Sequence, residues 1–277
     1  MIEKLSIVIP CYNDPLFIEE SIDSAISQSY GNKEVIVVDD GSDVETKEII
    51  KSFKSKIDLI ITQENKGLSA ARNKGIQEAN GKYIIVQDSD DYFDSSFAEK
   101  AINIIRSNED CKIVTCEARR FSQAGTIDIF TPVGGSLRNF LFQNSAIGNA
   151  LFRKDEFLKI EGYDEEMTQG FEDWEFYIRL LELGGYAHVI KEPLFNYRQK
   201  NISMRREANQ IQFEIWEYIF KKNRHLYLAS YDKLIENYTK TLRKERNQFL
   251  KLKDSKEYIL GDLILKPFRY LKKRFLS

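Results

Sequence analysis

Tyr83-Ile84-Ile85-Val86-Gln87-Asp88-Ser89-Asp90-Asp91 is the stretch on which the fold prediction rests. Its first half is a β-rich apolar run typical of a buried strand, and its second half places three acids within four residues. The end of a parallel strand lies at the crevice where open α/β sheets bind ligands. Carboxylates there suit Mg²⁺ or Mn²⁺ and, through the metal, phosphate. On these residues alone, the alternative is a solvated turn whose acids only cap the helix expected to begin near Ser95.

Alternating strands and helices surround this stretch and predict an α/β fold. Apolar strands are expected at 5–10, 34–38 and 57–61, separated by a helix that starts at Asp14-Pro15 and a helix at about 44–53. An Asp cap followed by Pro at the first helical position is typical of a helix start. The βαβαβ order predicts a parallel sheet with right-handed crossovers.

The second half of the chain shows a weaker pattern, and its elements are predicted as follows. We expect a helix at 95–106, strands at 112–117, 145–153 and 186–190, a helix at 171–181, and a loop at 193–203. Beyond Arg205 the composition changes to long charged helices, roughly at 206–223 and 228–252. The chain is thus predicted to form a mixed, largely parallel sheet flanked by helices, with a C-terminal helical extension.

Composition narrows the function classes. The chain is 42% hydrophobic and 30% charged, as in ordinary globular proteins. Its formal net charge of −2 provides no global field for nucleic acid, so no nucleic-acid partner is expected. Cys11, Cys111 and Cys116 lack zinc-ligand spacing and are predicted to be buried thiols in a reducing compartment. Without a cleavable signal or a membrane-spanning apolar run, we expect a cytoplasmic protein, with peripheral contact at the inner face of the cell membrane left open.

Two further groups of polar residues allow more than one interpretation. Arg72 lies near the start of a helix that follows Asn65-Lys66-Gly67, where a guanidinium could meet a phosphate or an acid at a neighbouring strand end. An ordinary surface ion pair is the alternative. Glu172 and Asp173 lie in the first turn of an amphipathic helix, where acids can simply complement the helix dipole, a contribution of about 0.3–1 kcal/mol.

Taken together, these motifs resemble those of the family 2 glycosyltransferases, which have the GT-A fold. The resemblance extends to about Ser203. The matching segments, in the family's order, are Ser6–Pro10 with Tyr12-Asn13, Val37–Ser42, Asn65-x-Gly67 with Ala71–Asn73, Asp88–Asp91, Gly162–Asp164 and Glu172-Asp173. The resemblance implies a catalytic domain at 1–203, divided at about residue 117 into a nucleotide-sugar-binding half and an acceptor-binding half at 118–203. Residues 204–277 would form the helical extension.

The same resemblance implies a reaction. A sugar, of the hexosyl or N-acetylhexosaminyl class, would move with inversion from a nucleoside-diphosphate sugar, expected to be a UDP-sugar, to a hydroxyl acceptor. The acceptor would be a saccharide or lipid-linked saccharide in surface polysaccharide or glycolipid synthesis. A divalent cation stabilises the departing diphosphate, and a positioned carboxylate that takes the acceptor proton typically contributes about 10²–10⁴-fold.

Residue roles follow from the resemblance by position. It assigns the general base to Asp173 and the Mn²⁺ or Mg²⁺ ligands to Asp88 and Asp90. Nucleotide-sugar contacts are expected from Pro10, Tyr12, Asn13, Asp39, Asp40, Asn65, Gly67, Arg72, Asp88, Ser89 and Glu172.

One motif departs from the family's pattern. Many members carry Tyr-Arg-x-His after the last sheet strand, and the histidine can join the metal or diphosphate site; this chain has Tyr197-Arg198-Gln199-Lys200. A lysine cannot share a divalent cation, but its ammonium can bind a phosphate. Lys200 is therefore expected to be a diphosphate contact.

Two other function classes remain as alternatives. A non-catalytic nucleotide-sugar-binding module is disfavoured by the intact Asp88, Asp90 and Asp173. A sugar nucleotidyltransferase usually has a Gly-rich, basic loop after its first strand, where this chain has Cys11-Tyr12-Asn13-Asp14.

The C-terminal segment Leu263–Leu276 mixes apolar and basic residues, with no acid after Asp262. If Pro267 lies in the first turn of a helix, apolar residues share one face of it. Such a helix can bind an anionic membrane surface. Packing on the preceding helices, or oligomerisation through the C-terminal helices, remains the alternative.

Overall fold

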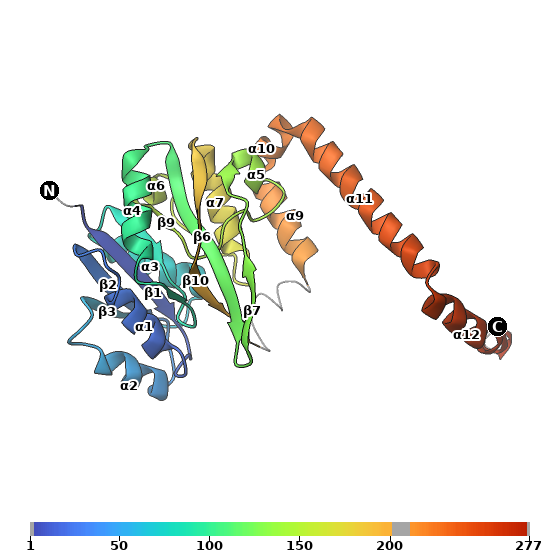
Figure 1. The fold of residues 1–277 in the computed structure, drawn as a ribbon, viewed down its shortest axis with the longest axis horizontal. Helices are drawn as coiled ribbons and strands as arrows, with labels where there is room; N and C mark the ends of the chain where they lie inside the picture. Colours follow the sequence, from blue (N-terminus) through green and yellow to red (C-terminus); the bar gives the residue numbers. More distant parts are fainter. Residues whose placement is uncertain (1–2, 201–210, 276–277) are drawn as a thin grey trace. The chain divides into compact units, whose positions relative to one another are not determined.

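The computed structural model describes residues 3–200 and 211–275, with residues 267–275 described by their backbone alone (Figure 1). The chain divides into two compact units, Met1–Lys221 and Lys222–Ser277. The first unit holds the sheet and the helices that cover it. The described part of the second unit is helical, with α10 (Arg224–Ala229), α11 (Tyr231–Lys253) and α12 (Lys256–Phe275).

A ten-stranded mixed sheet forms the centre of the first unit. One half consists of four parallel strands, in spatial order β3 (Leu59–Thr62), β2 (Lys33–Asp39), β1 (Leu5–Cys11) and β4 (Tyr83–Val86). The other half continues from β4 with β9 (Leu151–Arg153), β6 (Cys111–Ser122), β10 (Tyr186–Arg198) and β5 (Tyr92–Phe93). The short strands β7 (Gly125–Phe130) and β8 (Gly135–Ser136) pair with β6 and β10. Because β9 is antiparallel to both neighbours while β10 is parallel to β6, the sheet is mixed and largely parallel, as predicted.

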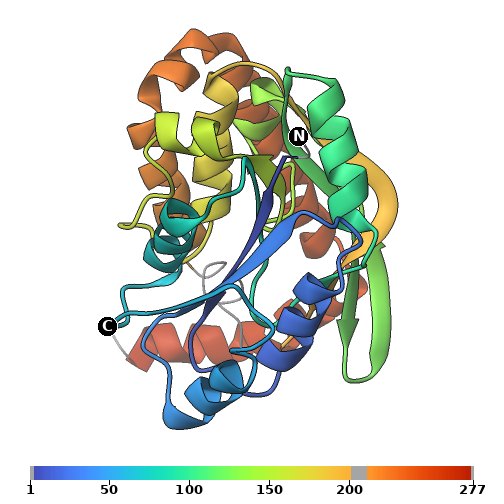
Figure 2. The same ribbon diagram turned by 90° about the vertical axis from the view of Figure 1, so that its left-hand side faces the viewer.

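Helices cover both faces of this sheet. One face carries α1 (Ile18–Ile26), α2 (Val44–Ser52) and α4 (Phe97–Ser107); the other carries α3 (Leu68–Glu78), α6 (Lys154–Lys159) and α7 (Glu172–Glu182). Figure 2 shows α1 and α3 on opposite sides of β1 and β2. A Cβ at Gly75 of α3 would clash with Val8 and Val38, so this helix packs closely on the strands only because it has a glycine there.

The first helix begins later than predicted. Residues 15–17 form turns, and α1 starts at Ile18, whose N–H donates to the Asp14 carbonyl at 3.2 Å. The Asp14 carboxylate does not cap this helix, because it accepts from Ser89 Oγ and pairs with Lys200 instead. The prediction of a helix start at Asp14-Pro15 is therefore wrong by about one turn.

Two strands differ in length from the prediction. The strand expected at 145–153 is confined to β9, because the carbonyls of Ile147 and Gly148 leave the ladder and accept from the Tyr177 hydroxyl, both at 2.9 Å. The loop expected at 193–203 is in part strand, since β10 continues to Arg198. Its pairing with β6 shifts register between Ile190 and Phe195, and this irregularity spans Pro193, which has no N–H for the ladder.

Helix α9 (Gln212–Lys222) packs on the first unit. Its Ile215 and Ile219 are buried, and the ring of Trp216 meets that of Trp174 edge-on at 6.1 Å between centroids. The Tyr218 hydroxyl donates to Asp164 Oδ2 at 2.7 Å. The compact unit thus extends beyond the predicted boundary at residue 203, and the functional division at 203/204 stays a prediction. The first residues of the helix expected from Arg206 lie outside the described ranges.

The second unit is described by itself. None of the α11 side chains is buried, and α12 places Pro267 in its interior rather than in a first turn, contrary to the prediction. The side chains of the predicted amphipathic segment from residue 267 onward lie outside the described part of the chain. Within the described residues, no helix is both long enough and apolar enough to cross a membrane.

The three cysteines are buried and form no disulfide, as predicted. Burial raises the pKa of the Cys11 thiol to about 12 and that of Cys111 to about 11. These thiols are therefore neutral packing residues.

Candidate active site

The topology brings the predicted polar residues to one edge of the sheet. β1, β2 and β4 are parallel, with Cys11 opposite Asp39 and Val8 opposite Val86, so their carboxyl ends lie side by side. The loops that follow these strands are 12–15, 40–42 and 88–91. This edge is the place where open α/β sheets bind ligands.

Asp40 orders the loop that leads into α3. Its carboxylate accepts hydrogen bonds from the backbone N–H groups of Lys66 and Gly67, both at 2.9 Å, and from Gln63 Nε2 at 2.8 Å. Gly67 has φ +91°, a left-handed conformation that favours glycine. The Asn65 side chain accepts from the same Gly67 N–H at 3.2 Å. These residues hold the entrance of α3 in a defined shape.

A second set of bonds joins the loops after β1 and β2. Asp39 Oδ1 accepts from the Ser42 N–H at 2.8 Å, and Asn13 Oδ1 accepts from the Asp43 N–H at 2.7 Å. Pro10 is buried at the end of β1, whereas Tyr12 is 52% exposed. Tyr12 is thus the aromatic side chain that these ordered loops leave open to a ligand.

Arg72 connects the two halves of the site from within the core. Its residue is 1% exposed; Nη2 donates to Asp88 Oδ1 at 2.7 Å and Nη1 donates to Glu172 Oε1 at 2.6 Å. Its guanidinium also lies over the Tyr163 ring, 5.3 Å from the centroid. Burial disfavours the charge, but the two carboxylates raise the pKa of Arg72 well above its usual value. Arg72 therefore ties the loop after β4 to the start of α7, and its direct contact with a nucleotide stays a prediction.

The acids after β4 have different environments. Both carboxylate oxygens of Asp88 accept hydrogen bonds. Arg72 donates to Oδ1, and the side-chain nitrogen of Asn149 donates to Oδ2 at 3.2 Å in the amide orientation that satisfies its hydrogen bonds. Asp91 is buried and accepts from the Arg198 N–H at 2.7 Å. Asp90 keeps a 29% exposed side chain with Lys200 Nζ 2.9 Å from its Oδ2. Burial raises the pKa of both Asp90 and Asp91.

This donor set fits a divalent cation that is shared with a substrate. No group of three or more His, Cys, Asp or Glu in the described ranges could hold a metal by itself. Mg²⁺ at nucleotide sites is usually bound by one or two carboxylates together with substrate phosphates and water. Asp90 offers such a carboxylate at the open edge of the sheet. Both oxygens of Asp88 are engaged by Arg72 and Asn149, so a metal there would compete with these contacts, and the metal contact of Asp88 stays a prediction.

Asp173 lies at the start of α7 beside Glu172. Its Oδ2 accepts from Asn144 Nδ2 at 2.7 Å, and its Oδ1 accepts from the Trp174 N–H at 2.8 Å. Burial and the neighbouring Glu172 carboxylate raise the pKa of Asp173 to about 6, although the positive charge of Arg72 lowers it. A carboxylate with a pKa near neutrality is suited to general-base catalysis.

Several contacts fix the position of this carboxylate. A Cβ at Gly148 would lie 3.0 Å from Asp173 Oδ2, so the backbone at residue 148 lies directly against the carboxylate. Trp174 Nε1 donates to the Phe140 carbonyl. Phe171, just before α7, has φ +60°, a left-handed conformation uncommon for a non-glycine residue. Such outliers are often found at functional sites.

Four residues of the site are additions to the sequence prediction. The sequence offered Asp14 only as a helix cap and Arg198 only as a motif residue without a role. It assigned no role to Asn144 or Asn149. Arg198 fastens the acidic loop, because its Nε donates to the Asp90 carbonyl at 3.0 Å while its N–H binds Asp91. Only the spatial contacts of these side chains reveal their roles.

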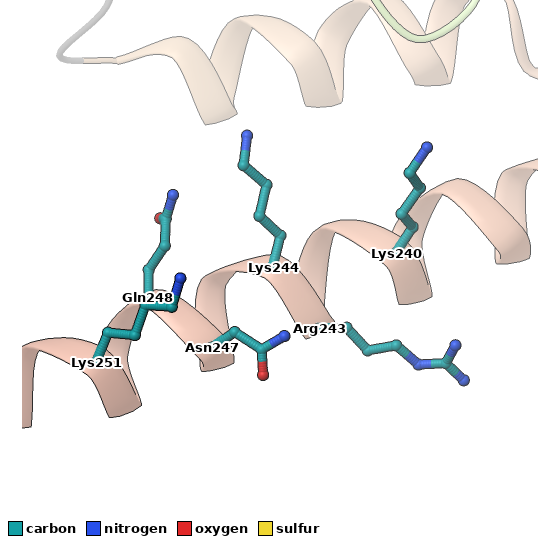
Figure 3. Close-up of a pocket in the computed structure, with 6 residues that line it drawn as sticks. All are labelled: Lys240, Arg243, Lys244, Asn247, Gln248 and Lys251. Carbon is teal, nitrogen blue, oxygen red and sulfur yellow. The ribbon is translucent and has the colours of Figure 1, made fainter. Parts of the chain in front are cut away.

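A separate hollow lies on α11 of the second unit. Figure 3 shows its six lining residues, all on that helix: Lys240, Arg243, Lys244, Asn247, Gln248 and Lys251. Four of the six are cationic and none is an acid or an aromatic residue. The hollow therefore has neither a candidate base nor a stacking surface for a nucleotide, and it is not a candidate active site.

Comparison with known proteins follows the geometry. A family model described as "Glycosyl transferase family 2" matches residues 6–155, more than half of the 277 residues, and a model described as "Glycosyltransferase like family 2" matches residues 109–258. TuaG of Bacillus subtilis (strain 168), a glycosyltransferase assigned to teichuronic acid biosynthesis, is 26% identical over 87% of this chain and 97% of its own length. The glycosyltransferase GlyA of Streptococcus pneumoniae serotype 4 is 33% identical over 56% of this chain but only 22% of its own length.

Solved structures show the same fold at low sequence identity. The S. aureus TarS 1–349 complex with UDP-GlcNAc has a TM-score of 0.63 at 20% identity, covering 74% of this chain and 61% of that chain. The mannosyltransferase PcManGT from Pyrobaculum calidifontis, in complex with GDP-Man and Mn²⁺, has a TM-score of 0.57 at 16% identity, covering 75% of this chain and 59% of that chain. This chain thus spans less than two thirds of GlyA and of both structural neighbours.

Proposed function

The chain belongs to glycosyltransferase family 2, and from this premise we propose that it transfers a sugar from a nucleoside-diphosphate sugar to a hydroxyl acceptor with inversion. One observation carries the proposal: the buried Arg72 joins Asp88, on the donor side, to Glu172, whose neighbour Asp173 has the pKa of a general base. Donor-side and acceptor-side acids are therefore parts of a single ion-paired framework. A non-catalytic binding module would have no need of a base with a pKa of about 6 at this point.

In this mechanism Asp173 takes the proton of the acceptor hydroxyl. Asn144 holds Oδ2 in place, and the Gly148 backbone closes one side of the carboxylate. Because a single base suffices and no covalent intermediate is needed, direct displacement inverts the anomeric centre. A divalent cation, Mn²⁺ or Mg²⁺, held by Asp90 would offset the charge that develops on the departing diphosphate.

The donor is proposed to be a UDP-sugar. The UDP-GlcNAc complex of TarS supports this choice, whereas the GDP-Man complex of PcManGT makes a guanosine donor the alternative to test. The residues proposed to bind the nucleotide sugar lie at the carboxyl ends of β1 and β2, in the loops after β1, β2 and β4, and at the entrance of α3. They are Pro10, Tyr12, Asn13, Asp39, Asp40, Asn65, Gly67 and Ser89, with Arg72, Asp88 and Glu172 behind them and Lys200 beside the diphosphate.

The proposal is tested first by donor binding and then by turnover. UDP-, GDP- and dTDP-sugars are screened by thermal shift with and without Mn²⁺, and the best donor is assayed for hydrolysis and for transfer to saccharide and lipid-linked acceptors. We expect a stabilising nucleotide sugar whose effect requires Mn²⁺, and a product of inverted anomeric configuration by NMR. Asp90→Ala should abolish transfer and leave UDP binding indifferent to Mn²⁺. Binding without any turnover of the bound sugar would favour the non-catalytic module.

The acceptor is proposed to belong to surface polysaccharide or glycolipid synthesis, with the chain at the inner face of the membrane. The assignment of TuaG to teichuronic acid biosynthesis supports the first part. The second part is supported by charge, since residues 222–277 contain 15 Lys and Arg but only 6 Asp and Glu. On α11, large apolar side chains such as Tyr238, Leu242 and Phe249 are also exposed. Basic helices with exposed apolar side chains can bind anionic lipid surfaces.

A further inference from the structure

Lys200 places a cation beside the carboxylate that is proposed to hold the metal. Its Nζ lies 2.9 Å from Asp90 Oδ2 and 3.3 Å from Asp14 Oδ1. The other Asp14 oxygen accepts from Ser89 Oγ at 2.8 Å, so Asp14 belongs to the same loop edge as Asp90. One ammonium therefore bridges two carboxylates from the loops after β1 and β4.

The surrounding contacts hold the backbone next to this ammonium in position. Two residues before Lys200, the Arg198 N–H binds the Asp91 carboxylate and Arg198 Nε binds the Asp90 carbonyl, which fastens the end of β10 to the acidic loop. The Phe17 ring lies under both cations, 4.2 Å from Arg198 Cζ and 4.7 Å from Lys200 Nζ. The backbone near Lys200 is thereby fixed, while its side chain stays 31% exposed and can turn away from Asp90.

We propose that Lys200 is a tethered cation that keeps a divalent metal from Asp90 until the diphosphate of the donor is present. A metal ion and an ammonium cannot occupy the same side of one carboxylate, because their charges repel at this distance. A metal that binds Asp90 on the Oδ2 side must therefore displace Lys200. Without a nucleotide, a metal at this site breaks the ion pair between Lys200 and Asp90 and gains only one carboxylate and water as ligands.

The diphosphate changes this balance in two ways. Its oxygens supply additional ligands to the metal, and its negative charge gives the displaced ammonium a new partner. Metal and nucleotide therefore bind cooperatively, and each raises the affinity of the other by the same factor. This inference rests on the proposed metal site at Asp90, but it does not depend on transfer of a sugar.

The test measures Mn²⁺ binding to the full chain by electron paramagnetic resonance, with and without UDP. Lys200→Met keeps most of the length of the side chain and removes its charge. Lys47→Met on α2, where Lys47 is exposed, is the matched control. Without UDP, we expect Lys200→Met to bind Mn²⁺ about two- to fivefold more tightly than the wild type, the scale of a partly exposed ion pair. The factor by which UDP strengthens Mn²⁺ binding should fall correspondingly. The control should leave both quantities unchanged.

Two further variants keep the result interpretable. Adding Asp90→Asn to Lys200→Met should remove the gain in Mn²⁺ affinity, which locates the effect at Asp90. If Lys200→Met does not fold, Lys200→Gln replaces it, and thermal unfolding verifies either protein. Unchanged or weaker Mn²⁺ binding by the folded neutral variant without UDP overturns the inference, as does a gain that survives the loss of Asp90. Transfer activity does not enter these measurements, so a chain that fails to transfer sugar can still support the tethered cation.

Discussion

Asp173 combines a raised pKa with a fixed orientation. Burial and the Glu172 carboxylate bring its pKa to about 6, and the amide of Asn144 holds Oδ2 at 2.7 Å. A carboxylate of this kind is a stronger base than a free aspartate, yet it is still ionised at neutral pH. Asp90 is also raised in pKa by burial, but it faces a lysine at the open edge, which suits a ligand rather than a base.

Replacement of Asp173 tests its catalytic role. Asp173→Asn keeps the shape of the side chain and removes its basicity, so kcat should fall by roughly 10²-fold or more while the donor dissociation constant changes little. Asp155→Asn, an exposed acid on α6, is the control and should leave both values unchanged. A wild-type kcat in Asp173→Asn would reduce this residue to a partner of the α7 dipole.

The pH dependence of Asp173 has a defined sign. The base must be deprotonated, so kcat/KM should rise as the pH increases through about 6 and level off above it.

In folding, a pKa of Asp173 that is raised above its value in the unfolded chain favours the protonated native state. The resulting stabilisation is present at low pH and is lost as the pH rises through about 6. The free energy of unfolding of the wild type, minus that of Asp173→Asn, should therefore decrease between pH 5 and pH 7.5 in chemical denaturation. A difference independent of pH would contradict the raised pKa.

At the scale of elements, the site is assembled where the start of α7 meets three other segments. Arg72 of α3 binds Glu172, the 144–148 segment supports Asp173, and Trp216 of α9 packs on Trp174. Consecutive residues of α7 are thus held by elements from different parts of the chain. The position of the proposed base depends on packing around one helix turn rather than on a flexible loop.

A methyl group at Gly148 should disturb this packing at the base. Because its Cβ would lie 3.0 Å from Asp173 Oδ2, the carboxylate must shift by a few tenths of an ångström. We expect Gly148→Ala to lower kcat by about three- to tenfold, since small misplacements of catalytic groups are costly. Gly31→Ala, which has no heavy atom within 4 Å of its Cβ, is the control. An equal kcat for the two variants would show that the added methyl group does not displace the Asp173 carboxylate.

For the whole molecule, the two units differ in charge and in packing. Residues 222–277 are basic, whereas the chain as a whole has a net charge of −2, so the first unit is acidic. The first unit buries a continuous core and includes α9 as far as Lys221. The second unit exposes apolar side chains along α11 and the described part of α12.

Truncation should distinguish the boundary at 203 from the one near 221. Ending the chain after Ser203 removes Ile215, Ile219 and Trp216 from the first unit, whereas ending it after Lys222 keeps all of α9. Burial of an isoleucine contributes about 1.5–3 kcal/mol, and about 1 kcal/mol shifts Tm by about 2–4 °C at this size. We expect the shorter protein to melt about 10 °C or more below the longer one in calorimetry. Equal melting temperatures would place the domain end at 203.

Membrane binding is tested with the same longer truncation. The full chain should co-sediment with phosphatidylglycerol vesicles at low salt and be released at high salt, while the chain ending after Lys222 stays in the supernatant. Neutral phosphatidylcholine vesicles are the control. If the full chain does not bind anionic vesicles and instead sediments as a dimer, while the truncated chain sediments as a monomer, the second unit is an oligomerisation element.

Local sequence determined the sheet and the place of the candidate site. The apolar period of strands such as Leu5–Cys11 and Tyr83–Val86, together with the alternation with helices, was sufficient to predict parallel pairing. Parallel pairing in turn brings the acids after each strand to one edge. These properties follow from residues close together in the chain, and a sequence pattern can therefore carry them.

Only the tertiary structure decided what each polar side chain contacts. Arg72 and Glu172 are 100 residues apart, and Asp14 and Lys200 are 186 apart. No local period encodes such pairs, because the free energy that brings them together comes from packing of the whole sheet and its helices. For the same reason, the sequence left either a phosphate or an acid at a neighbouring strand end as the partner of Arg72, and it suggested a helix cap at Asp14. In the fold, Arg72 is a buried link between two carboxylates. Asp14 is one of the two carboxylate partners of Lys200.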